Sequence, residues 1–332
     1  MKVQNNIQLQ SYNSFGTKAI AKLFCEPETQ EELSEVLKQY SNEQKLVLGA
    51  GYNLFFTKDF DGIVIKPSMK NIEVIWEDED HVEIEAGAGV EWDKMVEGCV
   101  LKGYAGIENL SLIPSSVGAS PIQNIGAYGS EAKDTIVLVK AVDLITCKYI
   151  EFTNSECQFG YRNSIFKSSC RYIITSVVFR LSKSFTYKEK YIDLSRELKD
   201  VETPTLKQVR DAIVKIRTRK LPDAKTLPNA GSFFKNPILT LEEKNSLQRI
   251  VVDAPIYNIG DNNFKTSAAF LIEKAGFKGK RKGMVGTYEH HALVIVNYGT
   301  NIGKEISDFA NEIQEEVLKL FGIRLEPEVW IY

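Results

Sequence analysis

The chain has 332 residues, of which 43% are hydrophobic and 26% are charged, and its formal net charge is −3. This length predicts two or three globular domains, and the composition excludes a fibrous or disordered chain. The small net charge argues against duplex nucleic acid as a partner, because such a partner normally requires a broad basic surface.

Two short basic runs, 215–220 and 278–282, are expected to be solvated faces or sites for a small anion. Five scattered cysteines and three histidines form neither a CxxC nor an HExxH pattern, so we expect reduced thiols and no metal site. No stretch reaches the roughly 18 apolar residues of a membrane span, and residues 1–6 lack the apolar core of a signal peptide. These features predict a cytoplasmic protein without a membrane partner.

The first third of the chain alternates strands and helices. Thr29 and Glu32 have the spacing of a capping box, and apolar residues follow at helical spacing. A short strand is expected to lead into the glycine-rich turn 49–53, and a helix is expected to stop at Gly103. The expected strands are 45–48, 63–65 and 82–86, and the expected helices are 33–40 and 90–102.

Residues 109–130 carry no charge but contain two prolines and three glycines. These residues forbid a long helix, and the lack of charge suits water poorly, so the segment should be a covered loop. A buried loop needs partners for its backbone N–H and C=O groups. A large bound cofactor and the protein's own side chains are both able to supply them.

The remaining two thirds predict an α+β protein with mixed sheets. Thr205 and Gln208 indicate the start of a helix that ends near Leu221-Pro222, and a polar stretch, 182–205, precedes it. The other expected strands are 137–145, 149–153, 172–181 and 292–297, and the other expected helices are 267–275 and 306–321.

Two glycine clusters raise the question of a Rossmann fold. Residues 49–51 follow a strand but do not open a convincing helix, and residues 87–89 lack the third glycine of GxGxxG. Neither cluster is followed at the required distance by the acidic residue that would bind a ribose. We therefore reject a Rossmann fold, although glycine-rich turns can bind pyrophosphate in other folds.

Four stretches resemble one family, UDP-N-acetylenolpyruvoylglucosamine reductase, the MurB flavoenzymes. They follow the family's order and span nearly the whole chain, and a fifth stretch lies at 325–329 (LEPEV). The segment 184–194 also resembles the longer family type, which has an extra substrate-covering loop. The four stretches are 48–54 (LGAGYNL), 113–129 (IPSSVGASPIQNIGAYG), 159–164 (FGYRNS) and 229–237 (NAGSFFKNP).

The resemblance implies an α+β fold of the vanillyl-alcohol-oxidase/PCMH type. In that fold two subdomains bind FAD and a third domain covers the substrate. The expected divisions are 1–67 and 68–215 for the FAD-binding subdomains, 216–324 for the substrate domain, and 325–332 for a segment that returns to the active site.

The resemblance also implies FAD as cofactor and NADPH as co-substrate. We expect noncovalent FAD, because no histidine or cysteine lies in 109–130. The sequence departs from the family at Ala50, Tyr52 and Ser115, so we expect individual flavin contacts to differ there. The implied cofactor-binding residues are Gly49, Ala50, Gly51, Tyr52, Asn53, Ser116, Gly118, Ala119, Pro121, Gln123, Asn124, Gly126, Ala127 and Arg217.

Three residues match the family's catalytic positions. Reduction of an enolpyruvyl group leaves an enolate-like dianion, which requires positive charge positioned in advance. Arg162 would bind the carboxylate with its planar guanidinium, and Glu328 would assist there. Ser232 would donate the proton, although the dipeptide Gly231-Ser232 by itself is typical of a turn or a helix cap.

The implied substrate is UDP-N-acetylglucosamine enolpyruvate, which is reduced to UDP-N-acetylmuramate for peptidoglycan. Lys220 and Asn236 match positions that bind its diphosphate, and Tyr161 adjoins Arg162. Tyr191 is our choice for the tyrosine that folds over the nucleotide, with Tyr187 as a competitor because of an insertion around Lys188. We expect a monomer. The alternatives are another FAD-dependent oxidase or dehydrogenase of this fold and a non-catalytic nucleotide-sugar-binding protein.

Overall fold

The computed structural model describes residues 2–187 and 191–332, so the insertion around Lys188 lies outside the described residues. The chain forms two compact units. Unit 1 comprises 1–7, 21–50 and 61–219, and unit 2 comprises 8–20, 51–60 and 220–332. The chain therefore crosses from one unit to the other five times, and the four-part division expected from the sequence stays a prediction.

Unit 1 contains a four-stranded sheet in the order β1-β2-β5-β3, in which β3 runs parallel to β5. Helix α1 (Gln30–Gln39) packs on it through a buried apolar cluster shared with Ile63 and Ile65. The Thr29 hydroxyl accepts a hydrogen bond from the Glu32 amide, which confirms the predicted helix start. The strands are β1 (Gln4–Gln8), β2 (Ile20–Cys25), β3 (Lys45–Val47) and β5 (Phe60–Ile65).

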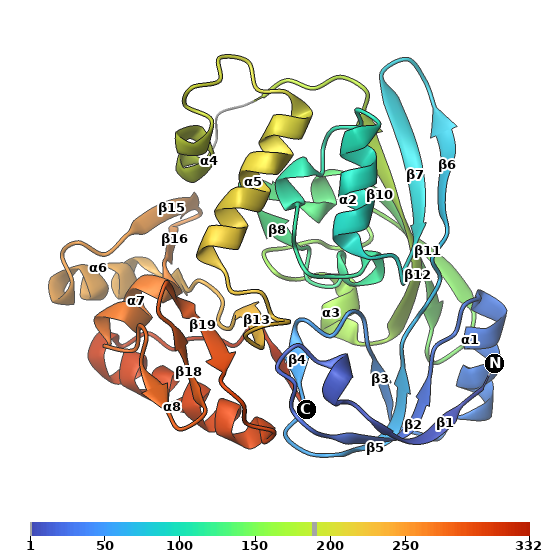
Figure 1. Cartoon of the computed structure of the whole chain (residues 1–332), viewed down its shortest axis with the longest axis horizontal. Coiled ribbons are helices and arrows are strands. Elements are labelled where there is room, and N and C mark those ends of the chain that lie inside the picture. The colour runs from blue at the N-terminus through green and yellow to red at the C-terminus, as the bar shows by residue number, and fades with distance from the viewer. Residues whose placement is uncertain (1, 188–190) are drawn as a thin grey trace. The chain divides into compact units, whose positions relative to one another are not determined.

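A five-stranded antiparallel sheet, in the order β11-β10-β12-β7-β6, forms the rest of the unit 1 framework (Figure 1). Trp92, the first residue of α2 (Trp92–Leu101), is fully buried, and its ring centroid lies 5.7 Å from that of Phe179 in β12. The Trp92 indole N–H donates to the Leu110 carbonyl, which ties the uncharged loop to this core. The strands are β6 (Ile72–Glu77), β7 (His81–Gly87), β10 (Ile136–Asp143), β11 (Tyr149–Thr153) and β12 (Tyr172–Ser182).

Helix α5 (Leu206–Lys220) begins at the predicted capping box. Thr205 and Gln208 each donate a backbone N–H to the other's side chain, at 2.9 and 3.3 Å. The polar stretch before α5 contains α4 (Ile192–Glu197), which the sequence analysis did not predict. The other short elements of unit 1 are η2 (Glu108–Leu110), η3 (Val117–Ala119), β8 (Gly126–Ala127), β9 (Ser130–Glu131), η4 (Ala132–Asp134) and α3 (Ile165–Ser169).

Unit 2 is built on an antiparallel sheet in the order β13-β19-β18-β17. Helix α8 (Gly303–Phe321) packs on β18 and β19 (Figure 1), and Gly322 ends it at φ 70°, as its sequence predicts. Phe15 and Phe55 lie in the same buried cluster as residues of the sheet, although they come from the first 60 residues. The strands are β13 (Asn229–Ser232), β17 (Arg281–Lys282), β18 (Val285–Tyr288) and β19 (His291–Asn297).

Smaller elements complete unit 2. A parallel pair joins β4 (Leu54–Phe55) to β20 (Trp330–Ile331), and a three-stranded sheet has the order β14-β16-β15. Helix α7 (Ala268–Lys274), which lies within the predicted range 267–275, is capped by Ser267, whereas α6 (Leu241–Ile250) was not predicted. The remaining elements are η1 (Gln10–Tyr12), β14 (Ile238–Leu239), β15 (Ile256–Gly260) and β16 (Asn263–Thr266).

Candidate functional site

In unit 1 the glycine-rich turn and the uncharged loop are in contact. A Cβ atom at Gly49 would lie 3.0 Å from Ser116 Oγ and 3.2 Å from the Cβ of Ala119. A Cβ atom at Gly118 would lie 2.6 Å from the Cβ of Ala88. The contact at Gly118 excludes a side chain, whereas a methyl group at Gly49 would require Ser116 or Ala119 to move by a few tenths of an ångström.

Ser116 is buried, and its hydroxyl has no hydrogen-bond partner among the described residues. The backbone amides of Gly49, Ala50 and Ser116 likewise donate no hydrogen bond within 2–187 and 191–332. A buried hydroxyl without a partner costs about 1–3 kcal/mol, so a native protein retains one only where something else satisfies it. This cluster of donors is suited to a ligand with phosphate oxygens.

Asn124 is fully buried, and its side chain is engaged within the protein. Its Nδ2 donates to Glu131 at 2.9 Å and to the Gly160 carbonyl at 3.2 Å, while its Oδ1 accepts from the Lys133 amide at 3.0 Å. Asn124 therefore ties the loop to its surroundings, and any part it has in cofactor binding is indirect.

Arg162 lies against the end of the same loop. Its guanidinium donates to the Gly126 carbonyl at 2.8 Å and lies 5.3 Å from the Tyr161 ring centroid. A Cβ atom at Gly126 would lie 3.1 Å from the Arg162 Nη1, so the lack of a side chain at Gly126 leaves room for the guanidinium. Arg162 has φ 52°, a strained value for a non-glycine residue that is typical of functional sites.

The other predicted loop residues lie around this contact. Gln123 accepts from Lys167 Nζ at 3.4 Å, and Pro121 precedes it in the turn after η3. Ala127 pairs with Ser130 in the β8–β9 hairpin. The loop is thus held by the protein along its length, and the Ser116 end carries the unsatisfied donors.

Tyr128, Tyr191 and Arg217 form a second group in unit 1. The Tyr128 and Tyr191 rings meet edge to face with centroids 5.2 Å apart, and burial raises the pKa of Tyr128 above its ordinary value. Arg217 lies beside Tyr128, and its Nε donates to the Leu112 carbonyl at 3.2 Å. Tyr191 is 43% exposed, whereas Tyr187 packs on an apolar cluster of α4 and α5 with its hydroxyl buried.

An ion pair that the sequence analysis missed supports this group. The Asp93 carboxylate accepts two hydrogen bonds from Arg210, at 2.7 and 2.9 Å, and also accepts from the Leu112 amide. Leu112 is thus held by α2 through its N–H and by α5 through its carbonyl. Asp93 and Arg210 are 117 residues apart, so no local pattern could have indicated their pairing.

In unit 2 the chain segments that carry Ser232 and Glu328 are paired. Ser232 ends β13, opposite Val294, and Gly231 precedes it at φ 68°. The chain that follows Ser232 forms an antiparallel bridge with the segment that carries Glu328, whose amide donates to the Phe233 carbonyl at 2.8 Å. Ser232 and Glu328, which are 96 residues apart in the sequence, thus lie on neighbouring chain segments of unit 2.

Asn53 is bound to the same segment. Its Nδ2 donates to the Glu328 carbonyl at 3.1 Å, and its own carbonyl accepts from the Trp330 amide at 2.9 Å. Gly51, two residues earlier, has φ 76°, and a side chain there would collide with the Tyr12 carbonyl. The glycine-rich turn, which includes Tyr52, therefore spans the boundary: Gly49 and Ala50 belong to unit 1, and 51–53 to unit 2.

The two predicted diphosphate-binding residues also belong to unit 2. Asn236 accepts from the Ala268 amide at 3.0 Å at the start of α7. Lys220 ends α5. Burial of His291 in β19 lowers the pKa of its side chain, and the charge of Lys220 lowers it further. His291 carries no sequence signal of its own. The structure thus groups Ser232, Glu328, Lys220 and Asn236 in unit 2, and Arg162 in unit 1.

Three further observations bear on expected partners and chemistry. Burial raises the pKa of the Cys99 thiol to about 12, so it stays a protonated core thiol. No group of three His, Cys, Asp or Glu side chains among the described residues is arranged to hold a metal ion. None of the described helices combines the length and apolar character that a membrane crossing requires.

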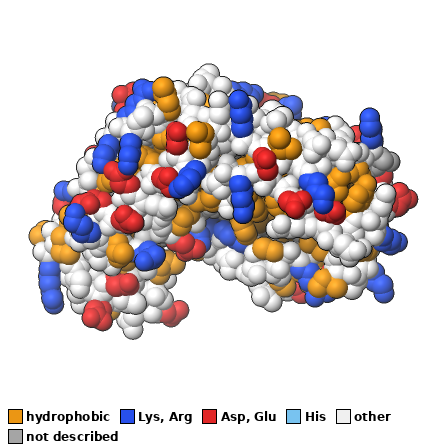
Figure 2. Space-filling view, turned by 90° about the horizontal axis from the view of Figure 1, so that it is seen from below, with side chains coloured by type: hydrophobic (Ala, Val, Ile, Leu, Met, Phe, Trp, Pro, Cys, Tyr) orange, Lys and Arg blue, Asp and Glu red, His pale blue; other side chains and the backbone are white. Residues whose placement is uncertain are grey.

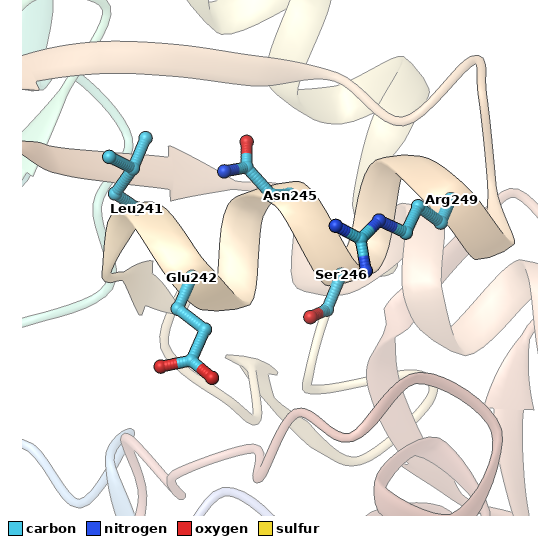
Figure 3. Close-up of a pocket in the computed structure, with 5 residues that line it drawn as sticks. All are labelled: Leu241, Glu242, Asn245, Ser246 and Arg249. Carbon is cyan, nitrogen blue, oxygen red and sulfur yellow. The ribbon is translucent and has the colours of Figure 1, made fainter.

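Basic and acidic side chains are interspersed over the face in Figure 2. The two basic runs are partly neutralised within their own units, since Lys215 pairs with Glu197, and Lys280 and Lys282 pair with Glu312. A pocket of about 430 Å³ lies on α6, and its five lining residues come from that one helix (Figure 3). It contains no predicted site residue.

Comparisons with known proteins bear on the family and the fold of the chain. Residues 222–332 match the family model "UDP-N-acetylenolpyruvoylglucosamine reductase, C-terminal domain", and residues 21–150 match "FAD binding domain". The crystal structure of UDP-N-acetylenolpyruvylglucosamine reductase (MurB) from Thermus caldophilus superimposes with a TM-score of 0.72 and 23% identity, covering 100% of this chain and 99% of that one. This likeness confirms the predicted fold.

The relatives are closer in sequence. UDP-N-acetylenolpyruvoylglucosamine reductase of Flavobacterium johnsoniae is 44% identical over 334 residues, and that of Amoebophilus asiaticus is 43% identical over 335 residues. Each alignment covers 99% of this chain and 99% of the relative. The chain belongs to the UDP-N-acetylenolpyruvoylglucosamine reductase family.

Proposed function

We propose that this protein is the FAD-dependent enzyme that reduces UDP-N-acetylglucosamine enolpyruvate to UDP-N-acetylmuramate with NADPH, in cytoplasmic peptidoglycan synthesis. The observation that supports the proposal is the backbone pairing in unit 2 between the segment that follows Ser232 and the segment that carries Glu328. It brings the candidate proton donor and the candidate carboxyl group onto adjacent chain segments, in the unit whose sequence matches the reductase's C-terminal domain. We expect a monomer that binds neither nucleic acid nor membrane.

The residues of unit 1 fit FAD. The unsatisfied Ser116 hydroxyl and the amides of Gly49, Ala50 and Ser116 would donate to the diphosphate oxygens. Gly118 permits the loop to pack tightly on Ala88 and so keeps these donors in place. Bound FAD supplies hydride transfer, from NADPH to the enolpyruvyl double bond.

The remaining chemistry falls to the side chains. Arg162, held over Tyr161 and against Gly126, would bind the substrate carboxylate and stabilise the negative charge that develops during reduction. Ser232 Oγ would give its proton to the carbon next to that carboxylate. One hydride and one proton together saturate the double bond, and Glu328 would assist at the carboxylate.

The nucleotide part of the substrate would be bound by other residues. Lys220 and Asn236 would contact the diphosphate. Between the two candidate tyrosines, exposure favours Tyr191 as the one that covers the nucleotide, because Tyr187 is packed among apolar residues. A Tyr191→Ala variant should raise KM for the sugar nucleotide, while Tyr187→Phe should not.

The test is a turnover experiment on the purified holoenzyme. Mixed with NADPH and the enolpyruvyl substrate, it should consume equal moles of both and yield a product heavier by two hydrogen atoms in mass spectrometry. Without the substrate, NADPH should bleach the flavin once. If NADPH is consumed only with formation of hydrogen peroxide, and the sugar nucleotide is recovered unchanged, the proposal is wrong and an oxidase function replaces it.

A further inference from the structure

The segment that carries Glu328 is paired to the chain after Ser232 by a short antiparallel ladder. Phe234 lies opposite Pro327, and the flanking amides of Lys235 and Glu328 donate to the carbonyls of Glu326 and Phe233, at 2.9 and 2.8 Å. This pattern makes Phe234 and Pro327 a non-hydrogen-bonded pair. The missing N–H of Pro327 therefore costs the ladder nothing.

An ion pair spans the outer end of this ladder. Lys235 Nζ lies 2.5 Å from Glu326 Oε1, and their side chains are 19% and 70% exposed. Lys235 follows Ser232 by three residues, and Glu326 precedes Glu328 by two. Because side chains alternate along a strand, Glu326 and Glu328 project from the same face of their segment.

Register at this ladder decides where Glu328 lies. A slip of one residue would shift the segment by about 3.4 Å and turn its side chains to the other face. A slip of two residues in one direction would put Glu328 opposite Lys235 instead of Phe233. In the native register Glu326 binds the Lys235 amine. A one-residue slip breaks this ion pair, and the two-residue slip replaces Glu326 with Glu328 at Lys235.

We propose that Lys235 and Glu326 are a positioning pair, which fixes the register of 326–328 on 233–235 and thereby holds Glu328 opposite Phe233, the residue that follows Ser232. The inference rests on the proposed function for its catalytic consequence. Lys235 and Glu326 act through the placement of Glu328, without contacting substrate or cofactor themselves.

The experiment uses the full-length holoenzyme and three variants, Lys235→Glu, Glu326→Lys and the double charge swap. The matched control is Lys274→Glu, because Lys274 pairs with Asp253 elsewhere in unit 2, and Asp253 is 69% exposed, much as Glu326 is. Three quantities are measured: bleaching of the flavin by NADPH, recovery of flavin colour on adding the enolpyruvyl substrate, and hydrogen exchange of the amides in 326–332.

In each single variant we expect colour recovery to slow by about tenfold, while bleaching by NADPH stays within about twofold. Amide exchange in 326–332 should accelerate in the same variants. The double swap should restore both quantities, and the control should change neither. Rescue by the swap separates a positional role from general damage, since the swapped protein carries both substitutions.

The proposal is overturned if the single variants recover colour at the parent rate, if both steps slow together, or if the double swap stays as impaired as the singles. Failure of the proposed function is a separate outcome. In that case the parent protein forms no product, and hydrogen exchange alone decides whether the pair fixes the register.

Discussion

The Ser232→Ala substitution should impair reduction of the enolpyruvyl substrate and spare the preceding reduction of the flavin by NADPH. Among the described residues the Ser232 hydroxyl makes no hydrogen bond, so its removal breaks none. The strand register opposite Val294 and the bond from the Phe233 amide to the Leu293 carbonyl are backbone interactions, which alanine retains. The free energy of unfolding should therefore change by no more than about 0.5 kcal/mol.

Catalysis should respond very differently. Loss of a general acid lowers turnover by roughly 10²–10⁴-fold, or about 3–5 kcal/mol of activation free energy. The loss should appear in kcat, because Lys220, Asn236 and Tyr191 are assigned to substrate binding. Bleaching of the flavin by NADPH should keep its parent rate, since no proton from Ser232 takes part in that step.

Stopped-flow absorbance of the flavin separates the two steps, and chemical denaturation measures the stability. Ser246→Ala, at an exposed serine of α6 in the same unit, serves as the control and should alter neither step. If Ser232→Ala enzyme, once bleached by NADPH, regains its colour with substrate and yields product at the parent rate, Ser232 is not the proton donor. If instead stability falls and both steps slow together, Ser232 has a structural role.

Three other substitutions test separate parts of the structure. Lys220→Ala should raise KM for the sugar nucleotide roughly 10–100-fold through loss of a charge-assisted contact, with FAD content unchanged; loss of FAD with an unaltered KM would contradict the assignment. Gly49→Ala should lower FAD content after gel filtration, because the new methyl group would press on Ser116 Oγ at 3.0 Å; full retention of FAD would show that the turn is not at the cofactor. Arg171 lowers the pKa of the buried Asp143 to about 2 from 3.8, so their pair stabilises the fold above pH 4 and loses its effect as the pH falls through 2. Asp143→Asn should thus cost about 2 kcal/mol at pH 7 in urea unfolding, and the difference from the parent should shrink in acid.

Local patterns predicted the elements that carry an amphipathic face or a cap. The reciprocal Thr205–Gln208 cap starts α5 as predicted, and α8 ends at Gly322. Helix α6 was missed although Thr240 and Glu243 form a capping box, because Leu247 is its one buried residue and the apolar periodicity is weak. Helix α4 was missed because it is short and polar.

The family resemblance names candidate site residues, whereas their contacts come only from the structure. The family resemblance named Ser232 and Glu328, while their neighbourhood depends on a non-local pairing that neither segment encodes alone. The resemblance also named Asn124, but only the structure shows that its side chain forms hydrogen bonds to Glu131 and Lys133 that hold the loop. The Lys235–Glu326 ion pair and the Asp93–Arg210 pair join residues about a hundred positions apart, beyond the reach of periodicity or spacing.

The parallel pairing of β4 with β20 has a consequence for how the protein folds during synthesis. Asn53 and Glu328, which are joined beside this pair, are 275 residues apart. Phe15 and Phe55, made early, belong to a core whose other members come after residue 230. Contacts of such sequence separation form slowly, because a long loop must close before they stabilise anything. Two phenylalanines must therefore stay exposed on the nascent chain until late in translation, and a fragment that begins at residue 222 would lack part of its own core.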